Sequence, residues 1–143
     1  YMEKNIVCSG ALFYSTSTKR FLFLQRTDKK TQGMWGLVGG QAKYTESAFE
    51  GLKREITEEV GDLPKFKKVI PLEMFTSNDQ KFFFHTYLIA IDAEFIPKLN
   101  GEHSGYCWTA FECWPKNLHM GLKNTLNNKS IKGKLQTILD LIV

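Results

Sequence analysis

Three glutamates in the middle of the chain have the spacing of a metal site. Glu55, Glu58 and Glu59 lie three and four residues apart, so on a helix their carboxylates project from one face. Carboxylates this close repel each other, and a hard divalent cation such as Mg²⁺, which takes oxygen ligands, relieves the repulsion. Arg54 can pair with Glu58 and hold it in place, and Glu46, at the end of the preceding loop, can reach the same region. This cluster is the part of the sequence most able to do chemistry.

The surrounding residues predict a loop that leads into a helix of three to four turns. Gly39-Gly40 is a turn motif, because paired glycines accept a positive φ without steric cost. Ser47 followed by Glu50 forms a capping box, which marks the helix start. Gly61 lies where a left-handed C-cap is expected. One apolar face of the helix is predicted at Ala48, Phe49, Leu52 and Ile56.

The same stretch resembles the Nudix box. That pattern is Gly, five residues, Glu, seven residues, Arg-Glu, an apolar residue, any residue, Glu-Glu, any residue, Gly. Its fixed positions correspond here to Gly40, Glu46, Arg54-Glu55, Ile56, Glu58-Glu59 and Gly61. Asp62 departs from the pattern, because the family usually has an aliphatic residue there, but that position serves packing. The resemblance covers essentially the whole chain and implies a single Nudix hydrolase domain over residues 1–143.

The resemblance also implies an activity and a set of site residues. We expect Mg²⁺- or Mn²⁺-dependent hydrolysis of a nucleoside diphosphate linked to another moiety. A backbone carbonyl near Gly39 is expected to join Glu55, Glu58 and Glu59 as a metal ligand. Glu102, in the loop before Trp108, is expected to be a fourth acidic ligand or the general base. The catalytic set is therefore Glu55, Glu58, Glu102 and Arg54.

Further residues are candidates for contacts with the substrate. Arg26 ends a predicted strand close to where the family binds pyrophosphate, and guanidinium makes bidentate bonds to phosphate. Gly40 and Glu46, two fixed positions of the box, are also predicted to contact the substrate. Four aromatic residues are candidates for stacking on a base, and Trp35 and Phe83 are carried forward as substrate-binding. Because aromatic residues make up 13% of the chain, most of them must be core. The four candidates are Trp35, Phe83, Tyr106 and Trp108.

The remaining elements predict an α/β fold, an α/β/α sandwich with a central mixed β-sheet. Runs of apolar residues predict strands at 5–14 and 21–26, joined as one hairpin, and at 65–76 and 81–91, joined as another. Residues 97–106 are predicted as a loop before a short strand at 107–111. Helical spacing is present at 118–126 and, more clearly, at 131–143. Strands on both sides of a central helix, followed by a C-terminal helix, favour this sandwich.

Composition places the chain among globular proteins of the cytoplasm. With 143 residues, 43% hydrophobic and 24% charged, it is long enough to bury one core. The formal net charge of +4 suits phosphate-rich ligands without requiring nucleic acid. Three cysteines without zinc-site spacing are interpreted as thiols in a reducing compartment, with Cys107 and Cys113 in the core. We expect no membrane partner. The sequence does not decide between a monomer and a homodimer.

Alternatives to the expected activity remain. One is a catalytically silent domain that binds a nucleotide or a protein as a regulator, although such domains usually lose box glutamates. Another is an RNA 5′-end pyrophosphohydrolase, for which the basic charge would serve binding. Members of the resembled family that act on ADP-ribose usually carry a proline at a set distance beyond the box. No proline occurs here between Leu72 and Ile96, so ADP-ribose is disfavoured as a substrate. Nucleoside triphosphates, including oxidised ones, and other nucleotide diphosphate derivatives such as sugar nucleotides remain as substrates.

Overall fold

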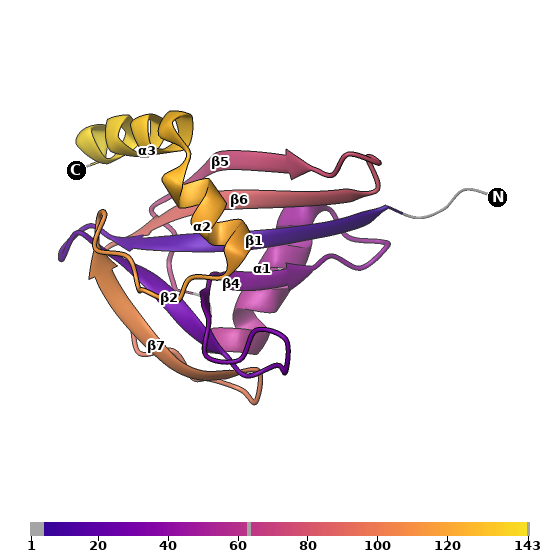
Figure 1. Cartoon of the computed structure of the whole chain (residues 1–143). Helices are drawn as coiled ribbons and strands as arrows, with labels where there is room; N and C mark the ends of the chain where they lie inside the picture. Colours follow the sequence, from indigo (N-terminus) through magenta and orange to yellow (C-terminus); the bar gives the residue numbers. More distant parts are fainter. Residues whose placement is uncertain (1–4, 63, 143) are drawn as a thin grey trace.

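A mixed β-sheet forms the centre of the protein (Figure 1). The computed structural model describes residues 5–62 and 64–142. Strand β1 (Ile6–Ser15) pairs in parallel with β6 (Phe82–Ile91) along its whole length. Strand β5 (Lys68–Thr76) continues the sheet as the antiparallel neighbour of β6. The predicted hairpin of the two runs 65–76 and 81–91 is confirmed.

The other edge of β1 is shared between two partners. Strand β4 (Val38–Gln41) pairs with residues 8–11 of β1, whereas β2 (Arg20–Arg26) pairs with its last two residues. Strand β2 then turns away from β1 and pairs with β7 (His103–Ala110) and β3 (Trp35–Gly36). The sheet therefore splays between β4 and β2, and the glycine pair lies on β4 beside that opening.

Alternation along the central strands builds one core on each face of the sheet. In β1, Ala11 and Phe13 face one core while Leu12 and Tyr14 face the other. Successive side chains of a strand point to opposite faces, so a strand that is covered on both faces is apolar at every position. This explains why β1, β2 and β6 are continuous apolar runs in the sequence.

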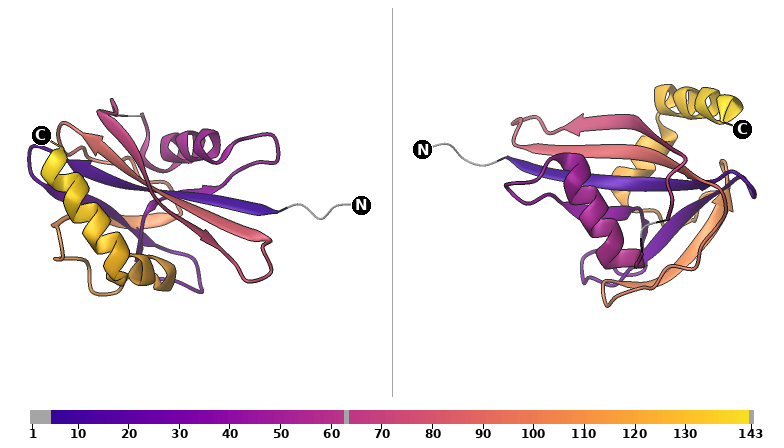
Figure 2. Two further views of the ribbon diagram at one scale, coloured as in Figure 1. Left: turned by 90° about the horizontal axis from the view of Figure 1, so that it is seen from above. Right: turned by 180° about the vertical axis from the view of Figure 1, so that it is seen from behind.

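Helices cover both faces (Figure 2). Helix α1 (Ala48–Val60) contributes Leu52, Ile56 and Val60 to one core. Helices α2 (Met120–Asn127) and α3 (Lys129–Leu141) cover the opposite face, where Leu122, Leu126 and Leu135 are buried. The α/β/α sandwich predicted from the sequence is confirmed. No helix within the described residues is long and apolar enough to cross a membrane.

The predicted boundaries of α1 are confirmed by its caps. Ser47 Oγ accepts from the backbone N–H of Glu50, and the Glu50 carboxylate accepts from the N–H of Ser47. Gly61 follows the last helical residue, as predicted, and its φ of 93° favours glycine, but its ψ of −141° is not that of the left-handed cap that the sequence predicted. The capping box therefore sets the start of the helix, and the glycine sets its end.

Several other boundaries differ from the sequence predictions. Strand β7 begins at His103, inside the predicted loop 97–106, because its pairing with β2 defines it. The residues around the glycine pair form the short strands β3 and β4, which the sequence did not indicate. Cys113 is exposed, so its assignment to the core was wrong. Val143, which the prediction included in the last helix, lies outside the described residues, as do residues 1–4 and 63 of the predicted domain.

Candidate active site

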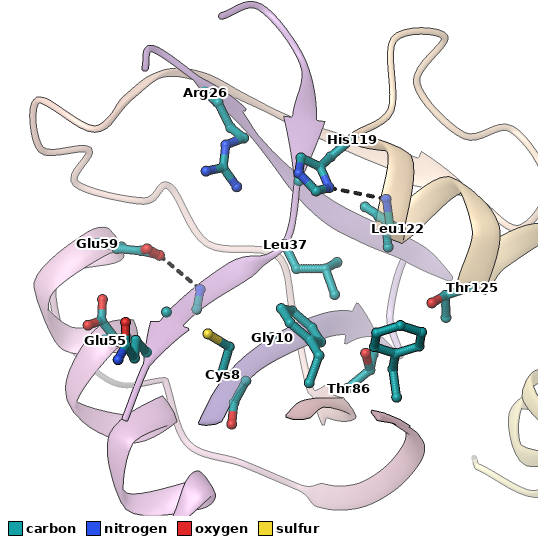
Figure 3. Close-up of a pocket in the computed structure, with 18 of the residues that line it drawn as sticks. Cys8, Gly10, Arg26, Leu37, Glu55, Glu59, Thr86, His119, Leu122 and Thr125 are labelled. Carbon is teal, nitrogen blue, oxygen red and sulfur yellow. Dashed lines mark hydrogen bonds between the residues drawn. The ribbon is translucent and has the colours of Figure 1, made fainter. Parts of the chain in front are cut away.

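A cavity of about 990 Å³ opens between the sheet, the C-terminal half of α1 and helix α2. Figure 3 shows Glu55 and Glu59 on one side of it and Leu122 and Thr125 on the other. We call the two sides the acidic end, lined by Glu55, Glu59 and Glu102, and the distal end, lined by residues of β5, β6 and α2. Three predicted metal ligands therefore meet in one cavity.

The glycine pair lets the backbone of β4 pass close to both β1 and α1. A Cβ at Gly39 would lie 2.0 Å from the carbonyl oxygen of Ser9, and a Cβ at Gly40 would lie 2.6 Å from Cδ of Glu55. The backbone N–H of Gly39 donates to Glu59 Oε1 at 2.8 Å. Any larger residue here would displace the strand or the carboxylate, so the glycines fix the distance between β4 and the acidic end.

Arg54 organises the glutamates of α1. Its Nε donates to Glu46 Oε2 at 2.8 Å, and its Nη1 donates to Glu55 Oε1 at 2.9 Å and to Glu58 Oε1 at 3.1 Å. The predicted pairing of Arg54 with Glu58 is confirmed. The guanidinium, together with the N–H of Lys43, lowers the pKa of Glu46 to about 2.

Three of the predicted site residues in this network, Arg54, Glu46 and Glu58, do not line the cavity. Glu46 has both carboxylate oxygens bonded to Arg54, so the structure gives it the role of a support. The side chain of Glu58 is 52% exposed and lies outside the cavity wall. Glu58 is nevertheless held within reach of the acidic end, because it shares the Arg54 guanidinium with Glu55.

Glu59 is a buried carboxyl group in a negative environment. Only 1% of the residue is exposed. Burial raises its pKa to about 8, and the charges of Glu55 and Glu102 act in the same direction, although the N–H of Gly39 opposes them. Burial also raises the pKa of Glu55, against the effect of Arg54. The fold thus places a buried and a partly buried carboxyl group beside one another, which disfavours their ionised forms.

The loop before β7 brings Glu102 to this end. Asn100 joins the two parts: its Nδ2 donates to the carbonyl oxygen of Glu58 at 3.0 Å, and its Oδ1 accepts from the N–H of Glu102 at 2.9 Å. Ligand atoms of Glu59, Glu102 and His103 lie within 4.8 Å of one another. Burial lowers the pKa of His103. No sequence motif marks Asn100, since its bonds depend on the tertiary fold.

These features fit a divalent cation. Carboxylate oxygens from two separate segments converge, and burial, together with the charges of Glu55 and Glu102, raises the pKa of one of the carboxyl groups, Glu59. A bound Mg²⁺ or Mn²⁺ would supply positive charge there and take oxygen ligands, which both ions accept. The donor set therefore agrees with the metal that the resemblance implies.

Arg26 also lines the cavity, as the sequence predicted for a residue that contacts phosphate. Its Nε donates to Asp28 Oδ1 at 3.1 Å. The hydroxyl of Thr31 and the Arg26 guanidinium lower the pKa of Asp28 to about 2. Arg26 is thereby tethered at the rim of the cavity (Figure 3).

The aromatic residues of the cavity differ from those suggested by the sequence. Trp35 packs against the α2 side of the core, and Trp108 is buried in the α1 side. Tyr106 and Phe83 are also outside the cavity wall. Because side chains alternate along a strand, the neighbours of Phe83 point into the cavity in its place. The aromatic residues that line it are Phe75, Phe82 and Phe84.

The distal end was not identified from the sequence. Helix α2 begins at His119, whose Nδ1 accepts from the N–H of Gly121 at 3.3 Å, and burial lowers the pKa of this histidine. Polar residues of α2 and β5 line the cavity beyond it, including Glu73, Asn124 and Thr125. No motif marks these residues, since only the docking of α2 on the sheet brings them together.

Comparisons with known proteins agree with this geometry. The model of the NUDIX domain matches residues 5–128. No curated protein sequence matches the chain. A MutT NUDIX hydrolase from Burkholderia pseudomallei has a similar structure, with a TM-score of 0.67 and 22% identity over 89% of this chain and 99% of that one.

Two further solved structures share the fold. An Ap4A hydrolase from C. elegans has a TM-score of 0.70 and 18% identity, covering 94% of this chain and 99% of its own. The dihydroneopterin triphosphate pyrophosphohydrolase of E. coli has a TM-score of 0.64 and 20% identity, with coverage of 94% and 99%. At these identities the structures share the fold alone, while the domain match covers most of the sequence. The chain therefore belongs to the Nudix family, whose hydrolases act on pyrophosphate bonds.

Proposed function

We propose that the protein is a divalent-metal-dependent pyrophosphohydrolase that cleaves a nucleoside diphosphate linked to another moiety. The observation that carries the proposal is the convergence of Glu55, Glu59 and Glu102 at one end of a large cavity. Glu59 is buried there beside the charges of Glu55 and Glu102, and both burial and these charges raise its pKa. A substrate whose diphosphate carries a bound cation would complement the acidic end, and Arg26 lies at the rim of the cavity to contact the phosphate oxygens.

Glu55, Glu59 and Glu102 would hold the cation, with Glu58 and a carbonyl near Gly39 as further predicted ligands. When bound, Mg²⁺ or Mn²⁺ supplies a Lewis acid that withdraws charge from phosphoryl oxygens. The ligand geometry depends on Arg54, whose bonds to Glu55 and Glu58 orient both carboxylates. Asn100 does the same for the Glu102 segment.

The protein's own groups would then position substrate and water. Arg26 binds phosphate oxygens and stabilises the charge that develops on them. The general base is Glu102, which the resemblance suggests for that role, or Glu58, another member of the predicted catalytic set. A carboxylate oxygen accepts a proton from the attacking water, an oxygen–phosphorus bond forms, and the bond from phosphorus to the bridging oxygen breaks.

A hydrolysis screen tests the proposal. Nucleoside triphosphates, sugar nucleotides, dinucleoside polyphosphates and 5′-triphosphorylated RNA would each be incubated with Mg²⁺, with Mn²⁺ and with EDTA. We expect metal-dependent release of a nucleoside monophosphate and a second phosphorylated product from at least one nucleotide. Hydrolysis in water enriched in ¹⁸O would identify the phosphorus that is attacked. Absence of turnover with every substrate and both metals would leave the silent, nucleotide-binding alternative in its place.

A further inference from the structure

A β-bulge in β5 turns a carboxylate into the distal end of the cavity. Pro71 pairs with Tyr87 and Glu73 pairs with Thr86, so two steps along β5 match one step along β6. Ile70 and Leu72 both pack in the α2-side core, and strict alternation would direct Met74 to that side next. The bulge directs Glu73 there in place of Met74, since bulges re-aim the side chains that follow them.

The bulge is held from the helical layer. Lys134 of α3 donates its ammonium hydrogens to the carbonyl oxygens of Pro71 at 2.9 Å and Leu72 at 3.0 Å. Thr125 of α2 donates its hydroxyl to Glu73 Oε1 at 2.7 Å. The orientation of the Glu73 carboxylate is therefore fixed from both α2 and the strand.

Aromatic side chains flank this carboxylate. Phe75 shares the cavity side of β5 with Glu73 and is 53% exposed. Phe84, its cross-strand partner, and Phe82 line the same wall. An exposed aromatic wall is a platform on which a planar ring can stack, and a carboxylate at its border can only accept hydrogen bonds when ionised.

We propose that the distal end binds the base of the nucleotide and that Glu73 selects guanine. This inference rests on the proposed function, because it takes the acidic end as the diphosphate site. Guanine presents a ring N–H and an adjacent amino group on one edge, and one carboxylate can accept from both. Adenine and cytosine place an acceptor nitrogen beside their amino group, and uracil flanks its N–H with two carbonyls, so each of these edges opposes a carboxylate.

The first test compares kcat/KM for GTP, ITP and ATP with Mg²⁺. Inosine lacks only the amino group of guanosine, so GTP should be preferred over ITP, and ITP over ATP. A bidentate contact of this kind gives roughly tenfold to hundredfold discrimination. Glu73→Gln, which is isosteric, should bring the three values to within about threefold of each other, since an amide also donates. Thr125→Val should reduce the preference less, because it leaves the carboxylate in place.

Glu112→Gln is the matched control, since Glu112 pairs with Lys132 away from the cavity. It should keep the wild-type preference. Far-UV circular dichroism and melting curves establish that each variant is folded. A comparison of GTP with 2′-deoxy-GTP separates a contact with the base from one with the ribose: if Glu73→Gln changes that ratio and leaves GTP over ITP unchanged, the assignment to guanine is overturned.

A binding measurement separates this inference from the proposed function. NMR titration without metal gives the Kd of GMP, IMP and AMP. If no triphosphate is hydrolysed but GMP binds most tightly and Glu73→Gln removes the difference, the inference stands and the proposed function fails. If hydrolysis occurs with no preference for guanine, or with one that Glu73→Gln leaves intact, the inference fails alone. Absence of both hydrolysis and mononucleotide binding overturns both.

Discussion

The two ends of the cavity are built in different ways. The acidic end takes Glu55 and Glu59 from one helix, where a spacing of four residues places them together. The distal end takes Glu73 from a bulged edge strand and Thr125 from a helix 52 residues later. The two helical glutamates are local in sequence, although Glu102 joins them through the tertiary fold, whereas the distal end exists only after the sheet and α2 have docked. The acidic end should accordingly control catalysis, and the distal end selectivity.

The largest effect is expected from removing charge at the acidic end. Glu55→Gln and Glu58→Gln should each lower kcat by about 10²–10⁴-fold, the range for loss of a positioned catalytic group. Steady-state kinetics with saturating Mg²⁺ measure this. Melting temperatures should stay close to wild type, because neither carboxylate packs in the core. Wild-type turnover in either variant would refute its assigned role.

Asn100→Ala should weaken metal binding without removing a ligand. Its side chain joins the C-terminal turn of α1 to Glu102, and loss of such supporting bonds typically lowers metal affinity about tenfold to a hundredfold. Isothermal titration with Mn²⁺ gives the affinity. Asn117→Ala is the control, since Asn117 bonds to Gly33 and not to the acidic end. Equal Mn²⁺ affinities in both variants would argue against this role.

A pair of neighbouring phenylalanines tests the distal end. Phe84→Leu should raise KM roughly tenfold, because stacking of a base on an aromatic ring contributes about 1–3 kcal/mol. Phe83→Leu should leave KM near wild type, since Phe83 lies on the other side of β6. The reverse outcome would restore Phe83, the residue suggested by the sequence, as the substrate contact.

The smallest effect is a dependence of stability on pH. The folded-state pKa of Glu59 is raised to about 8, so the folded protein holds a proton that the unfolded chain has lost. This contribution is complete below the unfolded pKa near 4.5 and is lost as the pH rises through about 8. The melting temperature of the metal-free protein should therefore fall from about pH 7 to pH 9, and added Mg²⁺ should reverse the fall.

Glu59→Gln should flatten this profile, since the amide does not titrate. The interval above about pH 7 is chosen because His103 and His119 have lowered pKa values and titrate below it. An equal fall in wild type and Glu59→Gln would assign the effect to other groups.

The contrast between the two ends also explains what the sequence could predict. Residues close together in the sequence define the capping box and the helix. The same is true of the spacing of Glu55, Glu58 and Glu59, so these features could be predicted from the sequence. Phe83 is one of three consecutive phenylalanines in β6, and such a run in a strand covered on both faces gives no sign of which side chains face the cavity.

The bulge between Pro71 and Glu73 could not be predicted from the sequence either, because it is defined by the pairing of β5 with β6. Asn100 and Thr125 act through bonds to residues 42 and 52 positions away in the chain. Such contacts depend on the tertiary fold, whereas the acidic helix depends on neighbours within two turns.

Mn²⁺ binding followed by electron paramagnetic resonance tests the central claim most directly, because the signal of the free ion decreases as it binds. We predict saturable binding to the wild type and to Glu73→Gln, and loss of that binding in Glu55→Gln and Glu59→Gln. Binding that persists unchanged in both acidic-end variants, or a wild-type protein that leaves the ion free, would contradict the account.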